Sequence, residues 1–351
     1  MIRVPYTLRW LAVCLPLLVA GCARAPAPGV VELVYATPYG PTHPFSRADR
    51  RWMDFVEQRS QGRLKIRPSW SGALLSSEHS MVELRHGVAD IGLITPIYVK
   101  GGAHLIRVQS GFYSGADTVE SQVALYHCMA DADPQFAKET EGLKVLAVQG
   151  GSMPGLLTRS RPVTRLADLQ GLRIRVPTEL ISVMRKLGAD PVNMPMGEVY
   201  SALAKGVIDG VIAPPDTFRA LHFAEVARLY TTLKVPRGAY PARAMSAERW
   251  ARLAPQDQAV LEAGIAVWEA ALADTTRSAV EAGLKTAKND KVEFLSVSPE
   301  EQKTFLDLYA HEAETNAREL GRYGIDGEAV LPRARAAFAA DGSIQCQGNR
   351  T

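Results

Sequence analysis

A seven-residue pattern, L-x-x-G-V-x-D, occurs twice in this chain, as LRHGVAD at residues 84–90 and as LAKGVID at residues 203–209. Each copy stands where a helical pattern gives way to a short apolar run. The glycine is typical of a helix C-terminus, and the aspartate is typical of the turn that borders a strand. The general sequence preferences of helix-to-strand loops can also produce such a pattern twice. Its presence once in each half nevertheless favours two similar α/β lobes over one large sheet.

Short strand patterns alternate with helical patterns on both sides of these junctions. Elements of this size in this order predict mainly parallel sheets with helices on their faces. Ser77 is the expected N-cap of the second helix. We expect strands at residues 31–36, 62–70, 88–95, 143–150, 172–176, 207–213 and 228–233, and helices at residues 46–59, 77–87, 118–140, from 179 onward, 197–205, 298–321 and 326–339.

The longest helical pattern covers residues 255–288, where Leu261, Trp268 and Leu272 recur at helical spacing. A straight helix of this length measures about 50 Å, which exceeds the width of one small lobe. Gly264 lies inside the pattern and disfavours a helix by about 1 kcal/mol relative to alanine. Because 351 residues are too many for one compact core, we expect this helix to bridge two lobes or to bend.

The N-terminus has the features of an export signal. Arg3 and Arg9 form a basic segment, and the apolar run at residues 11–20 has signal-peptide length but is too short to span a bilayer. The run ends in LVAGC, and the small residues before Cys22 resemble the bacterial lipobox, in which the cysteine is lipidated and becomes the new N-terminus. The alternative is ordinary cleavage after Ala25, which would leave a proline directly after the cut. We favour lipidation at Cys22.

Of the four cysteines, Cys14 lies in the signal segment and Cys22 at the processing site. The remaining pair, Cys128 and Cys346, can form a disulfide in an oxidising compartment. Two buried free thiols are the alternative, since free cysteine is among the most buried residue types. We favour the disulfide.

Charge and motifs exclude several function classes. The formal net charge is +3, and removal of Arg3 and Arg9 leaves +1. Since no basic run remains, we expect no nucleic-acid partner.

Catalytic and metal-binding signatures are missing as well. GGSMP at residues 150–154 lacks the last glycine of G-x-S-x-G, and His79 and His86 have no H-E-x-x-H context.

The segment GLRIRVP at residues 171–177 alternates like a half-buried strand, which places Arg173 and Arg175 together on one face. Either both guanidiniums are solvated on the surface or one of them binds an anion. A planar guanidinium stays charged at any relevant pH and pairs with two carboxylate oxygens.

This segment is followed by PMGEVYSALAKGVIDG at residues 195–210. Together the two segments resemble the solute-binding proteins of tripartite ATP-independent periplasmic (TRAP) transporters, a family that captures organic acids. The resemblance covers nearly all of residues 31–320. It extends to His43-Pro44, SQGRLKI at residues 60–66, Gly72-Ala73-Leu74, and the residues Trp250, Leu253, Pro255 and Gln258 at the start of the long helix.

The resemblance implies an α/β, bilobed periplasmic-binding-protein fold, with two α/β lobes joined by hinge strands and a long bridging helix. It implies that Arg175 forms a bidentate salt bridge with the ligand carboxylate, whereas Arg173 lies on the lobe surface. The expected division is a signal peptide at 1–21, a tether at 22–30, lobe I at 31–150 plus about 240–270, lobe II at 151–239 plus about 271–300, and C-terminal helices and tail at 301–351.

Two departures from the family pattern bear on the ligand. Many members carry another arginine where this chain has Met153-Pro154, and polar residues where it has Val211-Ile212-Ala213. A dicarboxylate or a sugar acid would leave groups unpaired here, at about 1–3 kcal/mol each. We therefore expect a less polar monocarboxylate, branched or aromatic. The residues expected near it are Met153, Ile212, Ala213 and Pro214, together with five aromatic residues that are either cavity wall or core, namely Tyr39, Tyr98, Phe112, Tyr113 and Tyr240.

The resulting hypothesis is a periplasmic binding protein, lipid-anchored to a membrane through Cys22, that delivers an organic acid anion to TRAP-type permease subunits. It implies neither catalysis nor a cofactor or metal. Two alternatives stay open. One is a periplasmic enzyme that acts on a carboxylated substrate, for which the sequence offers no nucleophile, metal set or acid/base pair. The other is a binding protein that reports to a membrane sensor.

Overall fold

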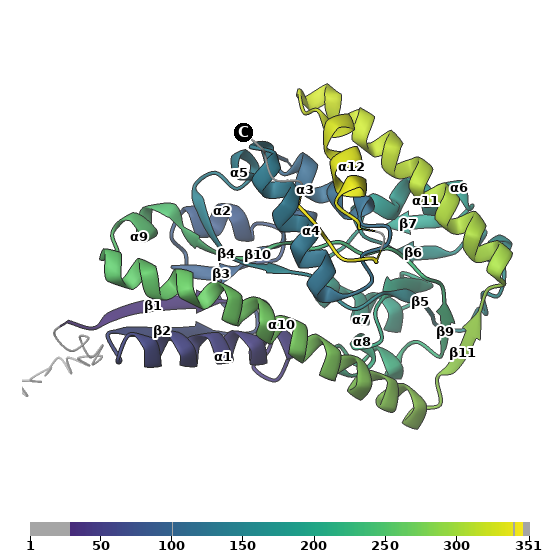
Figure 1. The fold of residues 1–351 in the computed structure, drawn as a ribbon. Helices are drawn as coiled ribbons and strands as arrows, with labels where there is room; N and C mark the ends of the chain where they lie inside the picture. Colours follow the sequence, from purple (N-terminus) through teal and green to yellow (C-terminus); the bar gives the residue numbers. More distant parts are fainter. Residues whose placement is uncertain (1–28, 100, 340, 347–351) are drawn as a thin grey trace, which may run out of the picture.

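The computed structural model describes residues 29–99, 101–339 and 341–346. Its strands form two sheets, which lie in opposite halves of the molecule (Figure 1). The first sheet has the order β2-β1-β3-β10-β4, and the second has the order β11-β9-β5-β8-β6-β7. The strands are β1 (Val31–Ala36), β2 (Leu64–Ser69), β3 (Ile91–Leu93), β4 (Leu143–Gln149), β5 (Gly155–Thr158), β6 (Arg173–Arg175), β7 (Asp190–Val192), β8 (Gly210–Ala213), β9 (Leu229–Thr232), β10 (Tyr240–Ser246) and β11 (Glu293–Ser296).

Helices surround both sheets, as the alternating pattern predicts. No helix among the described residues is long and apolar enough to cross a membrane. The helices are α1 (Pro44–Arg59), α2 (Ser80–Arg85), α3 (His104–Val108), α4 (Val119–Ala132), α5 (Gln135–Glu139), α6 (Ile181–Lys186), α7 (Met196–Ala204), α8 (Thr217–Ala220), α9 (Ala247–Ala251), α10 (Pro255–Asn289), α11 (Pro299–Glu319) and α12 (Gly327–Ala336).

The repeated L-x-x-G-V-x-D junction has the same structure in both sheets. In the first sheet, the Asp90 N–H donates to the Val34 carbonyl, and the Asp90 carboxylate accepts from the Val34 N–H at 2.8 Å and from Arg249 Nε at 2.9 Å. In the second sheet, Asp209 makes the equivalent backbone pair with Arg173 and also binds the Arg173 guanidinium. The repeated aspartate therefore holds the helix-to-strand loop against the neighbouring strand, which is a structural role.

The chain crosses between the two sheets from β4 to β5, returns from β9 to β10, and crosses again along α10. The strands that follow the first two crossings pair antiparallel with their neighbours, β5 with β8 and β9, and β10 with β3 and β4. Both sheets are therefore mixed, whereas the sequence predicts mainly parallel ones. The strands β5, β7, β10 and β11 were not among those expected, because they are short or directly follow a turn-rich crossing.

Helix α10 is a single helix of 35 residues that runs along both halves of the molecule (Figure 1). Trp268 on this helix stacks on Trp52 of α1, with ring centroids 3.8 Å apart. Gly264 permits this contact, because a Cβ atom there would lie 2.7 Å from the Trp52 indole nitrogen. The glycine that disfavours the helix is thus the residue that allows α1 to pack closely against it.

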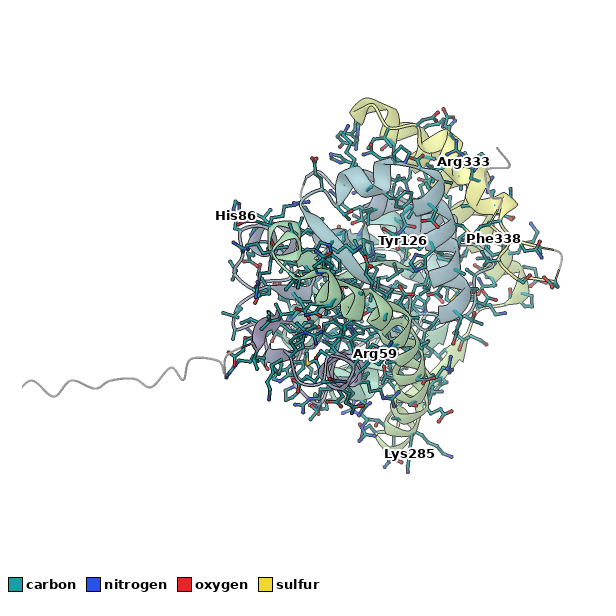
Figure 2. All side chains as sticks on the ribbon, turned by 60° about the vertical axis from the view of Figure 1, so that its left-hand side comes forward. Arg59, His86, Tyr126, Lys285, Arg333 and Phe338 are labelled. Atoms are coloured by element: carbon teal, nitrogen blue, oxygen red, sulfur yellow. A yellow bond between two sulfur atoms is a disulfide. The ribbon has the colours of Figure 1, made fainter. Side chains whose placement is uncertain are left out.

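The C-terminal helices contact both halves. Phe305 of α11 packs in the core of the second sheet, whereas Ala313 of α11 and Leu331 of α12 pack with residues of α4. Figure 2 shows the C-terminal segment beside the helix that carries Tyr126. Cys128 of α4 and Cys346 form a disulfide with a Cα–Cα distance of 5.1 Å, the pairing predicted from the sequence.

Two helix boundaries differ from those expected. The second helix begins at Ser80 rather than after Ser77, because Ser77 lies in a turn where its carbonyl accepts the Thr95 hydroxyl. The helix expected at residues 118–140 is interrupted at Asp133 and Pro134, between α4 and α5. Proline cannot donate the backbone hydrogen bond that would continue the helix, which explains the break.

Candidate functional site

A cavity lies between the two halves of the molecule. Its walls come from the loop after β1, the turn after β3, the carboxyl ends of β6 and β8, and the two segments that connect the sheets at residues 151–154 and 235–240. Carboxyl ends of parallel strands commonly form binding sites in α/β folds, because the loops that follow them converge there. Apolar side chains form much of the wall, including Phe45, Ile97, Leu180, Met196, Ile212, Leu221 and Val235.

Arg175 projects from the end of β6 into this cavity and is only 3% exposed. Its Nε donates to the Met194 carbonyl at 3.1 Å, and its Nη2 donates to the Tyr98 hydroxyl at 2.7 Å. A guanidinium has five N–H groups, so three of them have no protein acceptor among the described residues. No carboxylate of the described chain forms an ion pair with Arg175. The geometry suits an anion that enters from the cavity.

Arg173, on the same strand, has a different environment. Its side chain is 43% exposed and pairs with Asp209, with Nη2 and Oδ1 3.0 Å apart. The hydrogen bonds from Arg173 hold the pKa of Asp209 below its usual range. The surface position expected for Arg173 is therefore the one found, and its guanidinium is already occupied.

A second guanidinium, that of Arg237, also lines the cavity and was missed by the sequence argument. Its Nη1 donates to the Ser152 carbonyl at 3.2 Å. A Cβ atom at Gly151 would lie 2.2 Å from the Arg237 Cζ, so only glycine leaves room for the guanidinium in this position. Arg237 comes from the β9–β10 connection. It does not come from the segment at Met153-Pro154, where many family members carry an arginine.

Two acids face the same cavity, and neither was singled out from the sequence. Asp216 accepts the Ser152 hydroxyl at 2.8 Å, and its burial raises its pKa despite that bond and the nearby charge of Arg237. Burial also raises the pKa of Glu179 to about 7, although the charges of Arg175 and Arg237 lower it. Each acid lies in the loop or turn that follows a strand and resembles in sequence an ordinary acid of a helix N-terminus.

The opposite wall is aromatic. Tyr39 stacks on His43, with ring centroids 4.0 Å apart, and His43 Nδ1 accepts the Phe45 N–H at 3.2 Å. Burial lowers the pKa of His43 to about 3, so its imidazole is neutral throughout the physiological range. The Tyr240 hydroxyl accepts from Gln149 Nε2 at 3.1 Å. This wall therefore adds polar groups without adding charge.

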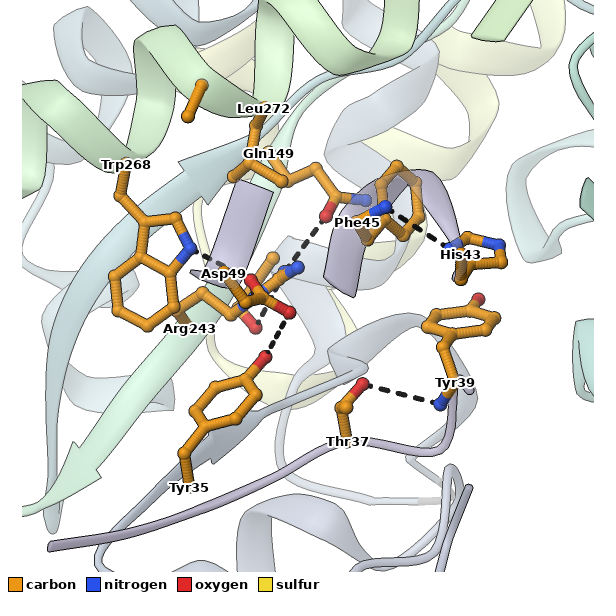
Figure 3. A network of polar contacts seen from close by, with 12 residues as sticks. Tyr35, Thr37, Tyr39, His43, Phe45, Asp49, Gln149, Arg243, Trp268 and Leu272 are labelled. Carbon is orange, nitrogen blue, oxygen red and sulfur yellow. Dashed lines mark hydrogen bonds and ion pairs between the residues drawn. The ribbon is translucent and has the colours of Figure 1, made fainter. Parts of the chain in front are cut away.

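Behind this wall lies a buried polar network (Figure 3). The Asp49 carboxylate accepts hydrogen bonds from the Tyr35 hydroxyl at 2.6 Å, from Arg243 Nε at 2.9 Å and from Trp268 Nε1 at 2.8 Å. Arg243 also donates to Gln149 Oε1 at 2.9 Å. Both members of the Asp49–Arg243 pair have fully buried side chains. The network joins α1, β1, β10 and α10 beneath the aromatic wall.

The residues expected near a ligand are only partly brought together. Arg175, Tyr39, Tyr98, Ile212, Pro214 and Tyr240 all line the cavity. Ala213 lies on the opposite face of β8, in the core, because side chains alternate along a strand. The Met153 sulfur lies 3.8 Å from Gln122 Nε2 and outside the cavity lining, and Phe112 and Tyr113 belong to the core around α4. Cys22 lies outside the described residues. No cluster of metal-ligating side chains is found in the part of the chain that the structure covers.

The sequence profile of the bacterial extracellular solute-binding proteins, family 7, matches residues 35–315 of this chain. The chain belongs to this family. The 2,3-diketo-L-gulonate-binding periplasmic protein YiaO of Escherichia coli is 26% identical over 183 residues, which cover 52% of this chain and 56% of that protein. The matched segment thus spans little more than half of that relative. The family comprises the solute-binding proteins of TRAP transporters, in agreement with the sequence argument.

Solved structures of TRAP solute-binding proteins share the fold. A protein from Rhodoferax ferrireducens, in complex with copurified benzoate, has a TM-score of 0.79 and 24% identity, and the match covers 88% of this chain and 97% of that one. A protein from Bordetella bronchiseptica, with bound (R)- and (S)-mandelate, has a TM-score of 0.77 and 24% identity, and the match covers 87% and 98%. This family member therefore has the bilobed periplasmic-binding-protein fold, and the cavity lies between its lobes.

Proposed function

We propose that this family 7 protein captures an organic acid anion in the periplasm and delivers it to a TRAP-type membrane permease. The main support is the Arg175 guanidinium, which is buried between the lobes and has three N–H groups without a protein acceptor among the described residues. A desolvated guanidinium in this geometry matches a carboxylate in charge and in shape.

The ligand is a monocarboxylate of modest polarity. Arg237 lies near the carboxylate of Asp216, which offsets its charge, so that Arg175 is the guanidinium left for the ligand. Ile212 and Pro214 line the cavity at the end of β8, where polar residues are common in the family. The relatives that bind benzoate and mandelate are consistent with a small, partly apolar acid.

Closure of the two lobes completes the site. Arg175 of the second lobe donates to Tyr98 of the first, and Thr178 donates to the Ile97 carbonyl at 3.4 Å, so both sides of the cavity contribute contacts. We take lobe I to be residues 31–150 plus about 240–270, and lobe II to be residues 151–239 plus about 271–300. Opening of the lobes would break these contacts and release the ligand.

A thermal-shift screen tests the proposed function. Monocarboxylates, dicarboxylates and sugar acids are each added to the purified protein, and the Tm is recorded. We expect small monocarboxylates to raise the Tm most, because a ligand that binds only the folded state stabilises it by mass action, by about 2.7 kcal/mol at a concentration of 100 Kd. An unchanged Tm with every acid would contradict capture of an organic anion, and stabilisation by dicarboxylates alone would contradict the assigned class.

The second element of the proposal is a lipid anchor at Cys22. We expect Cys22→Ser to move the protein from the membrane fraction to the soluble periplasmic fraction, because the thiol that carries the lipid is lost. Fractionation and immunoblotting measure the distribution, with Cys14→Ser as the matched control. An unchanged distribution, together with a mature N-terminus that begins after Ala25, would exclude the anchor.

A further inference from the structure

Glu179 is a buried acid within the ligand cavity. It lies in the 3₁₀ turn Thr178–Leu180 that follows β6, and it is only 7% exposed. Its Oε2 atom is buried without a hydrogen-bond partner in the described part of the chain. A buried carboxylate oxygen without a donor is costly, whereas a neutral carboxylic acid tolerates such a site and has a hydrogen to donate.

The charges that line the cavity point to the same state. The charged and titratable groups of the lining are the guanidiniums of Arg175 and Arg237, the carboxyls of Glu179 and Asp216, the neutral imidazole of His43, and the hydroxyls of Tyr39, Tyr98 and Tyr240. With both acids ionised, the two positive charges would be cancelled, and a carboxylate would gain little by entering. With one of the two acids neutral, one positive charge remains, which matches one carboxylate. Burial raises the pKa of Asp216 as well, but Asp216 accepts the Ser152 hydroxyl, whereas Glu179 Oε2 has no donor in the described part of the chain, so Glu179 is the acid that we assign as neutral.

The side chains of α11 and of the Ser110 segment that face Glu179 do not donate a hydrogen bond to its carboxyl group. Tyr309 of α11 lies near Glu179, and its hydroxyl is committed to the Ser110 carbonyl at 3.3 Å. Gly111, beside Ser110, packs against the Glu179 Cβ and offers no side chain. The backbone N–H of Glu179 itself and the charges of Arg175 and Arg237 favour the ionised acid, but burial outweighs them.

We infer that Glu179 takes part in ligand binding as a neutral carboxylic acid, so that capture of a monocarboxylate anion is coupled to proton uptake at this residue. The inference rests on the proposed function. A bound anion beside Arg175 disfavours a second negative charge in the cavity, and the Glu179 hydroxyl becomes available as a donor to the ligand.

The coupling has a definite sign. In the ligand-free protein, burial raises the pKa of Glu179 to about 7. An anion bound nearby raises that pKa further, so the complex holds more protons than the free protein above neutral pH. Affinity is therefore constant at lower pH and falls as the pH rises through the pKa of the free protein, by about tenfold between about pH 6 and about pH 8.5.

Isothermal titration calorimetry tests this coupling with benzoate, mandelate and phenylacetate. The parent is titrated at both pH values in buffers of different ionisation enthalpy, which measures the protons taken up. We expect Glu179→Gln to retain the affinity of the parent at low pH and to lose both the pH dependence and the proton uptake, because the amide is a permanent neutral donor. Glu198→Gln, at an exposed acid of α7, is the matched control and should behave as the parent.

A second measurement uses the protein without ligand. The ordinary pKa of this carboxyl is 4.5, so folding takes up a proton between that value and about 7. The parent should therefore lose Tm relative to Glu179→Gln as the pH rises through this range, with no difference at lower pH. Equal Tm profiles would overturn the neutral state of Glu179.

The outcomes separate the two levels of the proposal. If none of the acids binds at either pH, the proposed function itself fails for this class of ligand, and the coupled uptake fails with it. If an acid binds with the same affinity and no proton uptake at both pH values, the function stands and the inference is wrong. Loss of the pH dependence in Asp216→Asn but not in Glu179→Gln would also overturn the assignment to Glu179.

Discussion

Arg175→Ala should weaken acid binding on the order of a few hundred-fold or more. Removal of the guanidinium leaves the ligand carboxylate buried without its partner, which costs about 3–5 kcal/mol. The loss is expected to be this large because Arg175 is 3% exposed and water cannot replace its N–H groups in the closed cavity. Calorimetry with the acid found by the thermal-shift screen measures the change in Kd.

Two further variants make the test specific. Arg175→Lys should also bind poorly, because an ammonium is a point donor and cannot make two parallel hydrogen bonds to a carboxylate. Arg173→Ala should bind nearly as well as the parent, because Arg173 is held by Asp209 on the outer surface of the lobe. Equal losses at both arginines, or no loss at Arg175, would place the binding site elsewhere.

The second large effect concerns stability. Asp49→Ala should lower the free energy of unfolding by about 3–5 kcal/mol, because it leaves the Arg243 guanidinium buried without its counter-charge. Arg243 and Asp49 are both fully buried, and Tyr35 and Trp268 also lose their acceptor. Urea denaturation of the ligand-free protein measures the change.

The matched control for this variant is Asp307→Ala. Asp307 pairs with Lys303 one helical turn away on α11, and both side chains are largely exposed. Exposed pairs of this kind contribute about 0–1 kcal/mol, so the control should unfold near the parent midpoint. If Asp49→Ala were as mild as the control, Arg243 would have to find another partner or reach water.

Much of the fold follows from local patterns. The paired junctions at Asp90 and Asp209 indicate two similar lobes because helix ends and strand starts impose their own residue preferences. The alternation around Arg175 predicts its strand, and the resemblance to TRAP solute-binding proteins suggests the role that we propose for it. The long helix is predicted because its apolar residues recur over its whole length. These features depend on residues that are close in sequence.

The features that the sequence does not predict depend on distant residues. Arg237 faces Gly151 across 86 positions, and only the folded chain brings the guanidinium onto the glycine. Glu179 is covered by residues around Ser110 and by Tyr309 of α11, which are distant from it in the sequence on either side. Ala213 does not reach the cavity because it follows Ile212 on β8, and side chains alternate between the two faces of a strand.

Helix α10 constrains how a ligand can leave. Trp268 anchors the helix in the core of the first lobe, and Ala287 anchors it in the core of the second. The lobes therefore cannot simply move apart without bending the helix or breaking one of these contacts. Thr276 lines the cavity from α10 between these anchors, so any bend that opens the lobes would fall on the stretch of helix that borders the cavity.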